Sequence, residues 1–308
     1  VLNELNISSQ IFKKVNKYFF LYNDLVYESD SLFKELKPTN LIRYDNWVNN
    51  IYDFGDTLLC VGNFGRGVQF STDTAKSWHT YYPLLEEKRV DLTNIYYNKN
   101  QIYLLNQGFH DTKIYTSNDF GDSFNNVNLF LRINDFTVLE NKILIAGRFG
   151  IKESENYGMT FSQSDTNTVK NNFNISKIAQ TGSNELLAFS IFNGVFKSSD
   201  NANTWELLVD SLPTDTTFAS IEKFYEFGGS YYIVNSSPLR ILKSNDRGIS
   251  WSKLEIDLFE NIDAHYLEMI DENNILLSSY GNGINGLRIT NNQGKTWRRI
   301  DDNLPLQS

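Results

Sequence analysis

The stretch SNDRGISW, residues 244–251, concentrates oxygen-bearing side chains that could hold a ligand or a metal ion. A calcium loop of this kind needs several oxygen ligands at alternate positions and a distal Glu. A related stretch, SNDFGDSF (117–124), offers only Asp119 and Asp122, and a third, TNNQGKTW (290–297), has no carboxylate. The sequence therefore predicts no metal site and no cofactor, which makes a structural role the stronger interpretation of these loops.

The stretch belongs to a regular repeat with the pattern S/T-x-D/N-x-G/A-x-S/T-W/F. A worn further copy, VYESDSLF (26–33), aligns Asp30 with Asp73 and Phe33 with Trp78 after a shortened turn. Repetition at a spacing near 44 residues is a strong signal of a repeat architecture. The six full copies are STDTAKSW (71–78), SNDFGDSF (117–124), SENYGMTF (154–161), SSDNANTW (198–205), SNDRGISW (244–251) and TNNQGKTW (290–297).

Each repeat unit contains four short apolar runs separated by turn residues, as in NNIYDF (49–54), TLLCVGN (57–63), GVQFSTD (67–73) and SWHTYY (77–82). Four strands in a unit of this length are typical of a β-propeller blade. The sequence predicts an all-β fold in one domain, residues 1–308, as a single seven-bladed β-propeller of four-stranded antiparallel blades. The predicted blades span 6–38, 46–82, 92–128, 133–163, 173–209, 219–256 and 264–301.

The repeat resembles the Asp-box, or BNR repeat, of sialidases, xyloglucanase-type glycoside hydrolases, sortilin-type receptor domains and photosystem assembly factors. The resemblance covers nearly the whole chain and implies blade architecture. It does not imply an activity, because the same box occurs in enzymes and in binding proteins.

The box has a physical explanation as a hairpin between the third and fourth strands of a blade. Asp or Asn at its third position can accept hydrogen bonds from turn N–H groups, and the hydroxyls tie the hairpin ends together. Gly at the fifth position tolerates positive φ, so we expect Ala75 and Ala202 to adopt a slightly different turn. The final aromatic ring is expected between neighbouring blades. The structural box residues are Asp73, Trp78, Asp119, Phe124, Asn156, Phe161, Asp200, Trp205, Asp246, Trp251, Asn292 and Trp297.

A ligand site is expected on the opposite face, at the mouth of the propeller channel, where turns join the second and third strands. The aromatics of these turns could stack on sugars or grip a peptide, although packing against the next blade explains most phenylalanines. The arginines could bind carboxylates or rings, or form salt bridges to a neighbouring blade. The candidate ligand-binding residues are Phe64, Arg66, Phe109, His110, Arg148, Phe149, Phe192, Arg240 and Tyr280.

An enzyme is the competing interpretation, and we predict no catalytic residues. Connections into the first strands carry Asp91, Asp135, Glu222 and His265, which could serve glycoside hydrolysis in facing pairs. Solvated rim charges are the expected role. The sialidase resemblance implies an arginine triad and an Arg-Ile-Pro element, but LIRYD (41–45) and FLRIND (130–135) lack the proline. A glycan-active hydrolase or lyase using the same funnel remains the alternative.

The net charge and the lengths of the apolar runs limit the kinds of partner that the sequence favours. The net charge of −9 disfavours nucleic acid and anionic membranes, and no apolar run is long enough to span a bilayer, so no membrane insertion is expected. The single Cys60 lies in an apolar run and is expected to be a buried, inert thiol. The most favoured function is non-catalytic binding of a carbohydrate or protein partner by a monomer. An extracellular or periplasmic location, after removal of a signal peptide, is expected.

Overall fold

The structure is a computed structural model of the 308-residue chain. It describes residues 12–14, 17–22, 25–30, 33, 36–39, 48–54, 57–62, 68–81, 92–98, 101–107, 112–119, 123–129, 131–139, 142–165, 167–213, 221–236, 238–257, 264–279 and 286–301.

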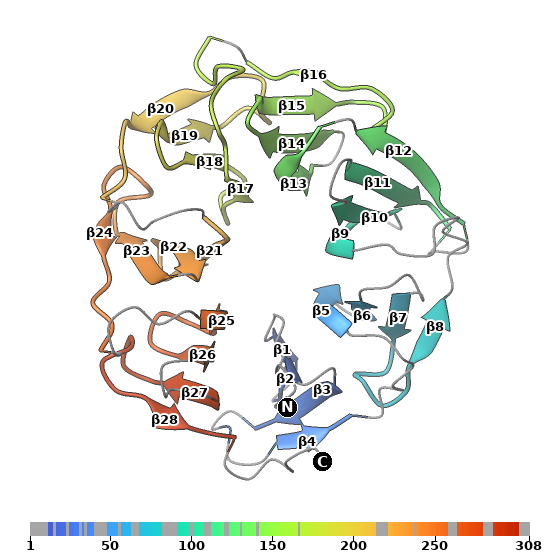
Figure 1. The fold of residues 1–308 in the computed structure, drawn as a ribbon, viewed down its shortest axis with the longest axis vertical. Helices are drawn as coiled ribbons and strands as arrows, with labels where there is room; N and C mark the ends of the chain where they lie inside the picture. The colour runs from blue at the N-terminus through green and yellow to red at the C-terminus, as the bar shows by residue number, and fades with distance from the viewer. Residues whose placement is uncertain are drawn as a thin grey trace, which may run out of the picture. The chain divides into compact units, whose positions relative to one another are not determined.

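The described residues form β-strands and turns only, and the strands make seven four-stranded sheets (Figure 1). Within each sheet the strands lie side by side in chain order, and every pairing whose register is described is antiparallel. The described part of the chain contains no helix long and apolar enough to cross a membrane.

The first four sheets follow one another along the chain. They consist of β1 (Phe12–Lys14), β2 (Lys17–Tyr22), β3 (Leu25–Ser29) and β4 (Leu36–Pro38); β5 (Val48–Phe54), β6 (Thr57–Gly62), β7 (Val68–Ser71) and β8 (His79–Tyr81); β9 (Leu92–Asn98), β10 (Gln101–Gln107), β11 (Thr112–Ser117) and β12 (Asn125–Leu129); and β13 (Ile133–Val138), β14 (Ile143–Gly147), β15 (Gly150–Ser154) and β16 (Ser162–Gln163).

The last three sheets continue the same order. They consist of β17 (Lys177–Gln180), β18 (Leu186–Ser190), β19 (Gly194–Ser198) and β20 (Glu206–Val209); β21 (Lys223–Phe227), β22 (Ser230–Ser236), β23 (Leu239–Ser244) and β24 (Ser252–Lys253); and β25 (Ala264–Met269), β26 (Ile275–Ser279), β27 (Gly286–Thr290) and β28 (Arg298–Arg299).

These bounds agree with the repeat pattern in the sequence. Each sheet lies within one predicted repeat unit, except that β12 continues to Leu129, one residue beyond the predicted end. The agreement has a local cause, because alternating apolar residues bounded by turn residues specify short antiparallel strands wherever they occur.

The chain divides into two compact units. Unit 1 comprises residues 1–108, 115–126 and 256–308, and unit 2 comprises residues 109–114 and 127–255. Unit 1 therefore contains both the first sheet and the last sheet, while unit 2 contains the complete sheets β13–β16, β17–β20 and β21–β24.

In unit 1 the first and last sheets pack against each other. Tyr18 and Phe33, which come from the first repeat, share one buried cluster with Leu276, Leu287 and Ile300. The Tyr18 and Phe33 rings lie 5.0 Å apart between centroids. A second cluster joins the first sheet to the second and includes Cys60, where burial raises the pKa of the thiol well above its usual value.

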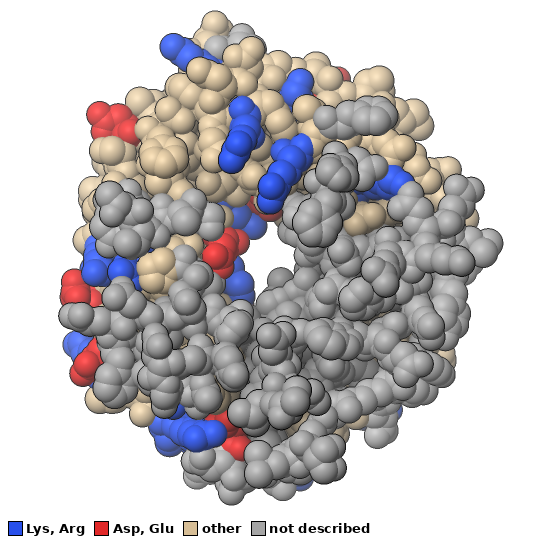
Figure 2. Space-filling model, viewed as in Figure 1, with Lys and Arg blue, Asp and Glu red and all other residues tan. Residues whose placement is uncertain are grey.

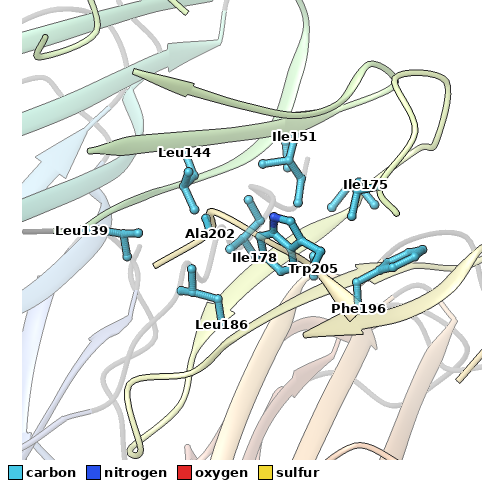
Figure 3. Close-up of a cluster of buried hydrophobic side chains, with 12 residues drawn as sticks. Leu139, Leu144, Ile151, Ile175, Ile178, Leu186, Phe196, Ala202 and Trp205 are labelled. Atoms are coloured by element: carbon cyan, nitrogen blue, oxygen red, sulfur yellow. The ribbon is translucent and has the colours of Figure 1, made fainter. Parts of the chain in front are cut away.

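In unit 2 the core lies between adjacent sheets. Leu144 and Ile151 of one sheet surround the indole of Trp205 together with Ile178 and Phe196 of the next sheet (Figure 3). Each fully buried aliphatic side chain of this kind contributes on the order of 1.5–3 kcal/mol. This packing fixes sheets β13–β16 and β17–β20 against each other, which matters for the candidate site.

Candidate functional site

The box at residues 244–251 is a closed network of hydrogen bonds within one hairpin. The Ser244 hydroxyl donates to Asp246 Oδ1 at 2.8 Å and accepts the N–H of Gly248 at 2.8 Å. Asp246 in turn accepts the N–H of Ser250 at 2.8 Å on Oδ1 and the Ser250 hydroxyl on Oδ2. The polar groups of the loop are thus used within the loop, which leaves little for a ligand.

The same contacts recur in the other boxes with two chemical versions. In the Asp version, as at Asp200, the threonine hydroxyl of Thr204 donates to the carboxylate at 2.6 Å. In the Asn version the direction is reversed, since the side-chain amide of Asn156 donates to the hydroxyl of Thr160 at 2.8 Å. Asn292 does the same toward Thr296. The geometry therefore depends on hydrogen bonding and not on a charge.

The Asp boxes nevertheless have perturbed acidity. Hydrogen bonds from the side chain and N–H of Ser77 lower the pKa of Asp73 to about 2, and those of Ser123 lower the pKa of Asp119 to about 2. Hydrogen bonds from Ser250 also lower the pKa of Asp246. The shifts arise because each turn donates to the charged form of the carboxyl group.

The expectation of a different turn at the two alanine boxes is wrong. Ala75 and Ala202 have φ of 62° and 67°, and each N–H reaches the first serine of its box as Gly248 does. The residue before them is also left-handed, with φ of 62° at Thr74 and 61° at Asn201. The side chains of Ala75 and Ala202 are buried in two different hydrophobic clusters. Each alanine therefore combines a buried methyl group with a φ that is unfavourable for a residue other than glycine.

The final aromatic residue of the boxes packs toward the preceding sheet. The indole N–H of Trp205 donates to Ser164 Oγ at 3.3 Å, and its backbone N–H donates to Asp165. Trp251 meets Phe189 of the preceding sheet edge to face, with centroids 5.9 Å apart. Among described residues, these rings join sheet to sheet.

Four of the nine predicted ligand-binding residues lie in the described part of the chain: Arg148, Phe149, Phe192 and Arg240. All four belong to unit 2. The remaining five, Phe64, Arg66, Phe109, His110 and Tyr280, lie outside the described residues and stay predictions.

Arg148 and Phe192 lie at the same end of adjacent sheets. The short segment before β17 establishes this, because the N–H of Ile175 donates to Gly147 O at 3.0 Å and the next N–H, of Ser176, donates to Phe189 O at 2.8 Å. Two consecutive residues thus join the end of β14 to the end of β18. We call this end of the two sheets, which holds the β14–β15 and β18–β19 turns, the turn end.

The two phenylalanines of these turns have different roles. The Phe149 ring lies over Gly147, where a Cβ atom would come within 2.6 Å of it, so only glycine leaves room for the ring. Lys152 Nζ lies over the same ring, 5.9 Å from its centroid. Phe192, in contrast, is 81% exposed. Phe149 is therefore a packing residue, and Phe192 is an apolar side chain presented to solvent.

Arg240 lies after the β22–β23 turn of the next sheet and is half-buried. Its guanidinium donates to the neighbouring carbonyl of Leu239 at 2.8 Å. Asn235, opposite it in the strand pairing, donates to Pro238 O at 3.0 Å. No contact joins Arg240 to Arg148 or Phe192 among the described residues, so the structure does not bring it into one cluster with them.

Three further cations at the turn end, Arg132, Lys152 and Lys170, are not among the residues predicted from the sequence. The carbonyl of Arg132 lies 2.9 Å from the Cβ position of Gly147, and the carbonyl of Lys170 lies 2.6 Å from that of Gly150. These contacts place both residues beside the Arg148 turn, and Figure 2 shows Lys and Arg side chains gathered over β13–β17. We call Arg132, Arg148, Lys152 and Lys170 the basic cluster. Arg132 and Arg148 flank strand ends, but Lys152 lies within β15 and Lys170 lies between β16 and β17, so no shared sequence signal marks the four residues.

Of the candidate catalytic residues, Asp135 is the best described, and its expected role as a solvated rim charge is wrong. Its side chain is 3% exposed, lies 3.2 Å from Lys177 Nζ and accepts the N–H of Ile178 at 2.9 Å. Burial raises its pKa, although the Lys177 ammonium opposes the shift. The carboxylate joins β13 to β17 in the interior.

Of the other candidate catalytic residues, only Glu222 has a described side chain. Glu222 is exposed at the start of β21, Asp91 lies outside the described residues, and nothing is described of the His265 side chain. Within the described residues, no group of three His, Cys, Asp or Glu side chains could hold a metal ion.

Comparison with known proteins identifies the fold class. No protein-family model matches the sequence, and no curated protein matches it. Among solved structures, YCF48 bound to a D1 peptide is similar with a TM-score of 0.62 and 13% identity, over 89% of this chain and 91% of that chain. The AfRom2 CNH domain is similar with a TM-score of 0.60 and 10% identity, over 91% of each chain.

A glycoside hydrolase is also similar. The GH74 enzyme of Niastella koreensis has a TM-score of 0.52 and 15% identity, over 82% of this chain and 45% of that chain. These solved structures are β-propeller proteins, and the chain shares their all-β fold. At such low identity the likeness shows the fold alone, because the class includes both enzymes and binding proteins.

Proposed function

We propose that the chain is a single seven-bladed β-propeller of Asp-box repeats over residues 1–308, and that it works as a non-catalytic binding module for a protein partner. Two observations support the closed seven-bladed arrangement. The first and last sheets share a buried cluster in unit 1, and the box hairpins carry one hydrogen-bond scheme from sheet to sheet. Export from the cytoplasm is part of the proposal.

The observation that carries the binding proposal is the exposure of Phe192. A phenylalanine that is 81% exposed at the tip of a short turn would gain favourable apolar burial if a partner covered it. The turn itself is ordered internally, since Ser190 Oγ accepts the N–H of Asn193 at 3.2 Å and donates to its side-chain oxygen at 3.0 Å. A fixed turn presents the ring at little entropic cost, as interface anchors require.

A protein partner fits this site better than glycan hydrolysis. The Asp135 carboxylate is engaged by Lys177 and Ile178, which removes it as one of the two carboxylates that hydrolysis requires. YCF48, a solved structure of the same fold, is bound to a D1 peptide, which gives a precedent for peptide binding by such a protein.

Site-specific cross-linking tests the proposal. A photo-reactive phenylalanine analogue at position 192 should capture a protein from extracts or medium of the producing cells. The matched control is the analogue at Met159, which is 69% exposed in the box hairpin at the opposite end of its sheet. Capture from position 159 but not from position 192 would place the interface at the box end of the sheet. Turnover of any substrate on a glycan panel would favour the glycan-active enzyme instead.

A further inference from the structure

The basic cluster is a local concentration of positive charge on a chain whose formal net charge is −9. Arg132, Arg148 and Lys170 are exposed and Lys152 is half-buried. None of these four cations has a carboxylate within ion-pair distance among the residues that the structure describes. Like charges held near one another repel, so the cluster is a favourable site for an anionic partner.

The backbone around the cluster is fixed and not a flexible loop. The N–H of Gly150 donates to Phe173 O at 2.9 Å, and Gln163 donates to the carbonyls of Phe149 and Ile151 at 3.0 and 2.9 Å. The Gly150–Phe173 bond holds the β14–β15 turn against the segment that carries Lys170, and the Gln163 bonds hold the turn against β16 of its own sheet. The positions from which Arg148 and Lys170 extend are therefore set before any partner arrives.

The acidic residues nearby do not cancel the charge of the cluster. Asp135 is buried and paired with Lys177. Asp165 accepts the backbone N–H groups of Asn167 and Trp205. Asp210 and Glu222 are exposed. The backbone of Asp210 lies 2.8 Å from the Cβ position of Gly194, beside the Phe192 turn, and Glu222 precedes β21; among the described residues no ion pair joins either carboxylate to the cluster.

We infer that the basic cluster binds the carboxylates of an acidic peptide segment, one of whose apolar side chains packs on Phe192. This inference rests on the proposed binding function and specifies the chemistry of its partner. Arginine suits the role because its planar guanidinium can hold a carboxylate with two parallel hydrogen bonds. Arginines and an exposed aromatic ring are also the residues enriched at protein interfaces.

An acidic peptide is favoured over an acidic polysaccharide as the partner because the amide side chains of Asn134 and Asn193 are already hydrogen-bonded within the protein. A sugar chain needs free hydrogen-bonding groups to receive its hydroxyls, and planar amides commonly supply them. At the turn end two of these groups are engaged internally, since Asn134 donates to Asn174 and to Ile175 O, each at 2.9 Å, and Asn193 bonds to Ser190, while Asn171 and Asn172 beside Lys170 are exposed. Charge and an apolar ring remain available, which matches an acidic peptide.

The test uses a fluorescein-labelled, glutamate-rich peptide containing one phenylalanine, with the 308-residue chain. Its glutamine counterpart and an alginate oligomer serve as the other two probes. The double variant Arg148→Glu/Lys170→Glu should weaken the Kd of the glutamate peptide by about tenfold or more. The control variant Arg247→Glu/Lys253→Glu changes the net charge equally at the box side of unit 2 and should leave the Kd within about twofold.

Each outcome of this binding test either supports or overturns the inference. Loss confined to the Arg148/Lys170 variant, with no binding of the glutamine peptide, supports the inference. Equal loss in both variants, tighter binding of alginate than of the glutamate peptide, or no binding of the glutamate peptide would overturn it. Cross-linking from position 192 is a separate measurement. If a partner were captured there and its binding did not depend on charge, the proposed function would stand and only the acidic chemistry of the partner would be rejected.

Discussion

The carboxylate of Asp135 lies 3.2 Å from the ammonium group of Lys177, and the two residues come from the first strands of adjacent sheets. The same carboxylate accepts the N–H of Ile178 at 2.9 Å. A charge that is 3% exposed is tolerated only when it is paired and hydrogen-bonded in this way. The pair therefore joins the sheets β13–β16 and β17–β20 on whose turn end Arg148 and Phe192 lie.

Removing this carboxylate should destabilise the protein without removing the binding surface. Asp135→Ala leaves Lys177 unpaired and the Ile178 N–H without an acceptor, so we expect a loss of roughly 3 kcal/mol of unfolding free energy. Asp135→Asn retains an oxygen for Ile178 and should cost less. Urea denaturation measures both variants. If Asp135→Ala unfolded at the wild-type midpoint, the carboxylate would have no structural role.

Removing a box carboxylate should affect stability only. Asp246→Ala loses the hydrogen bonds with Ser250 and Ser244, and we expect the unfolding free energy to fall by roughly 1–2 kcal/mol. Asp246→Asn should cost less, since Asn156 and Asn292 occupy the same position in two native boxes. Thermal melts test the order of the two variants. Loss of partner binding by Asp246→Ala at an unchanged melting temperature would place the site at the boxes.

The first residue of the box should matter as much as the third. Ser244 Oγ is the acceptor for the buried N–H of Gly248, so Ser244→Ala leaves that donor unsatisfied and should cost roughly 1–3 kcal/mol. Ser244→Thr is the matched control, because Thr290 performs the same function in the last box. Denaturation of the two variants in parallel gives the comparison. Equal stability of Ala and Thr variants would contradict the hydrogen-bond scheme.

Acid should weaken the protein through the Asp boxes. The folded pKa of Asp73 and of Asp119 is about 2, below the value of about 3.9 for an unfolded Asp. Their contribution to stability is therefore complete above the unfolded pKa and is lost as the pH falls through the folded pKa. The double variant Asp73→Asn/Asp119→Asn should show a flatter fall in urea midpoint between about pH 5 and about pH 2. A fall as steep as in the wild type would contradict this assignment.

The repeats and strands could be predicted because their signals are local. Every strand of the second sheet, from Val48 to Tyr81, lies on an apolar run bounded by turn residues, and a six-fold recurring box marks the hairpins. The turn conformation at Ala202 could not be predicted in the same way. The backbone φ of Ala202 is 67°, and its methyl group is buried beside Trp205. Neighbouring polar groups of the same box are hydrogen-bonded.

The basic cluster could not be predicted because it depends on packing between distant segments. Arg132 and Lys170 are separated by a whole sheet in the sequence, and the glycines at 147 and 150 bring their backbones together. An overall charge of −9 also conceals a local excess of cations. Likewise, Phe149 and Phe192 occupy equivalent turns, but only the contact of Phe149 with Gly147 distinguishes a packed ring from an exposed one.

The most direct test of the binding function is the affinity of the Phe192→Ala variant for the protein captured by cross-linking, measured by isothermal titration calorimetry beside Met159→Ala. Both side chains are largely exposed, so neither variant should change the melting temperature. We predict that Phe192→Ala weakens the Kd by about tenfold or more while Met159→Ala retains the wild-type value. Wild-type affinity of Phe192→Ala would contradict the assignment of the turn end as the binding surface.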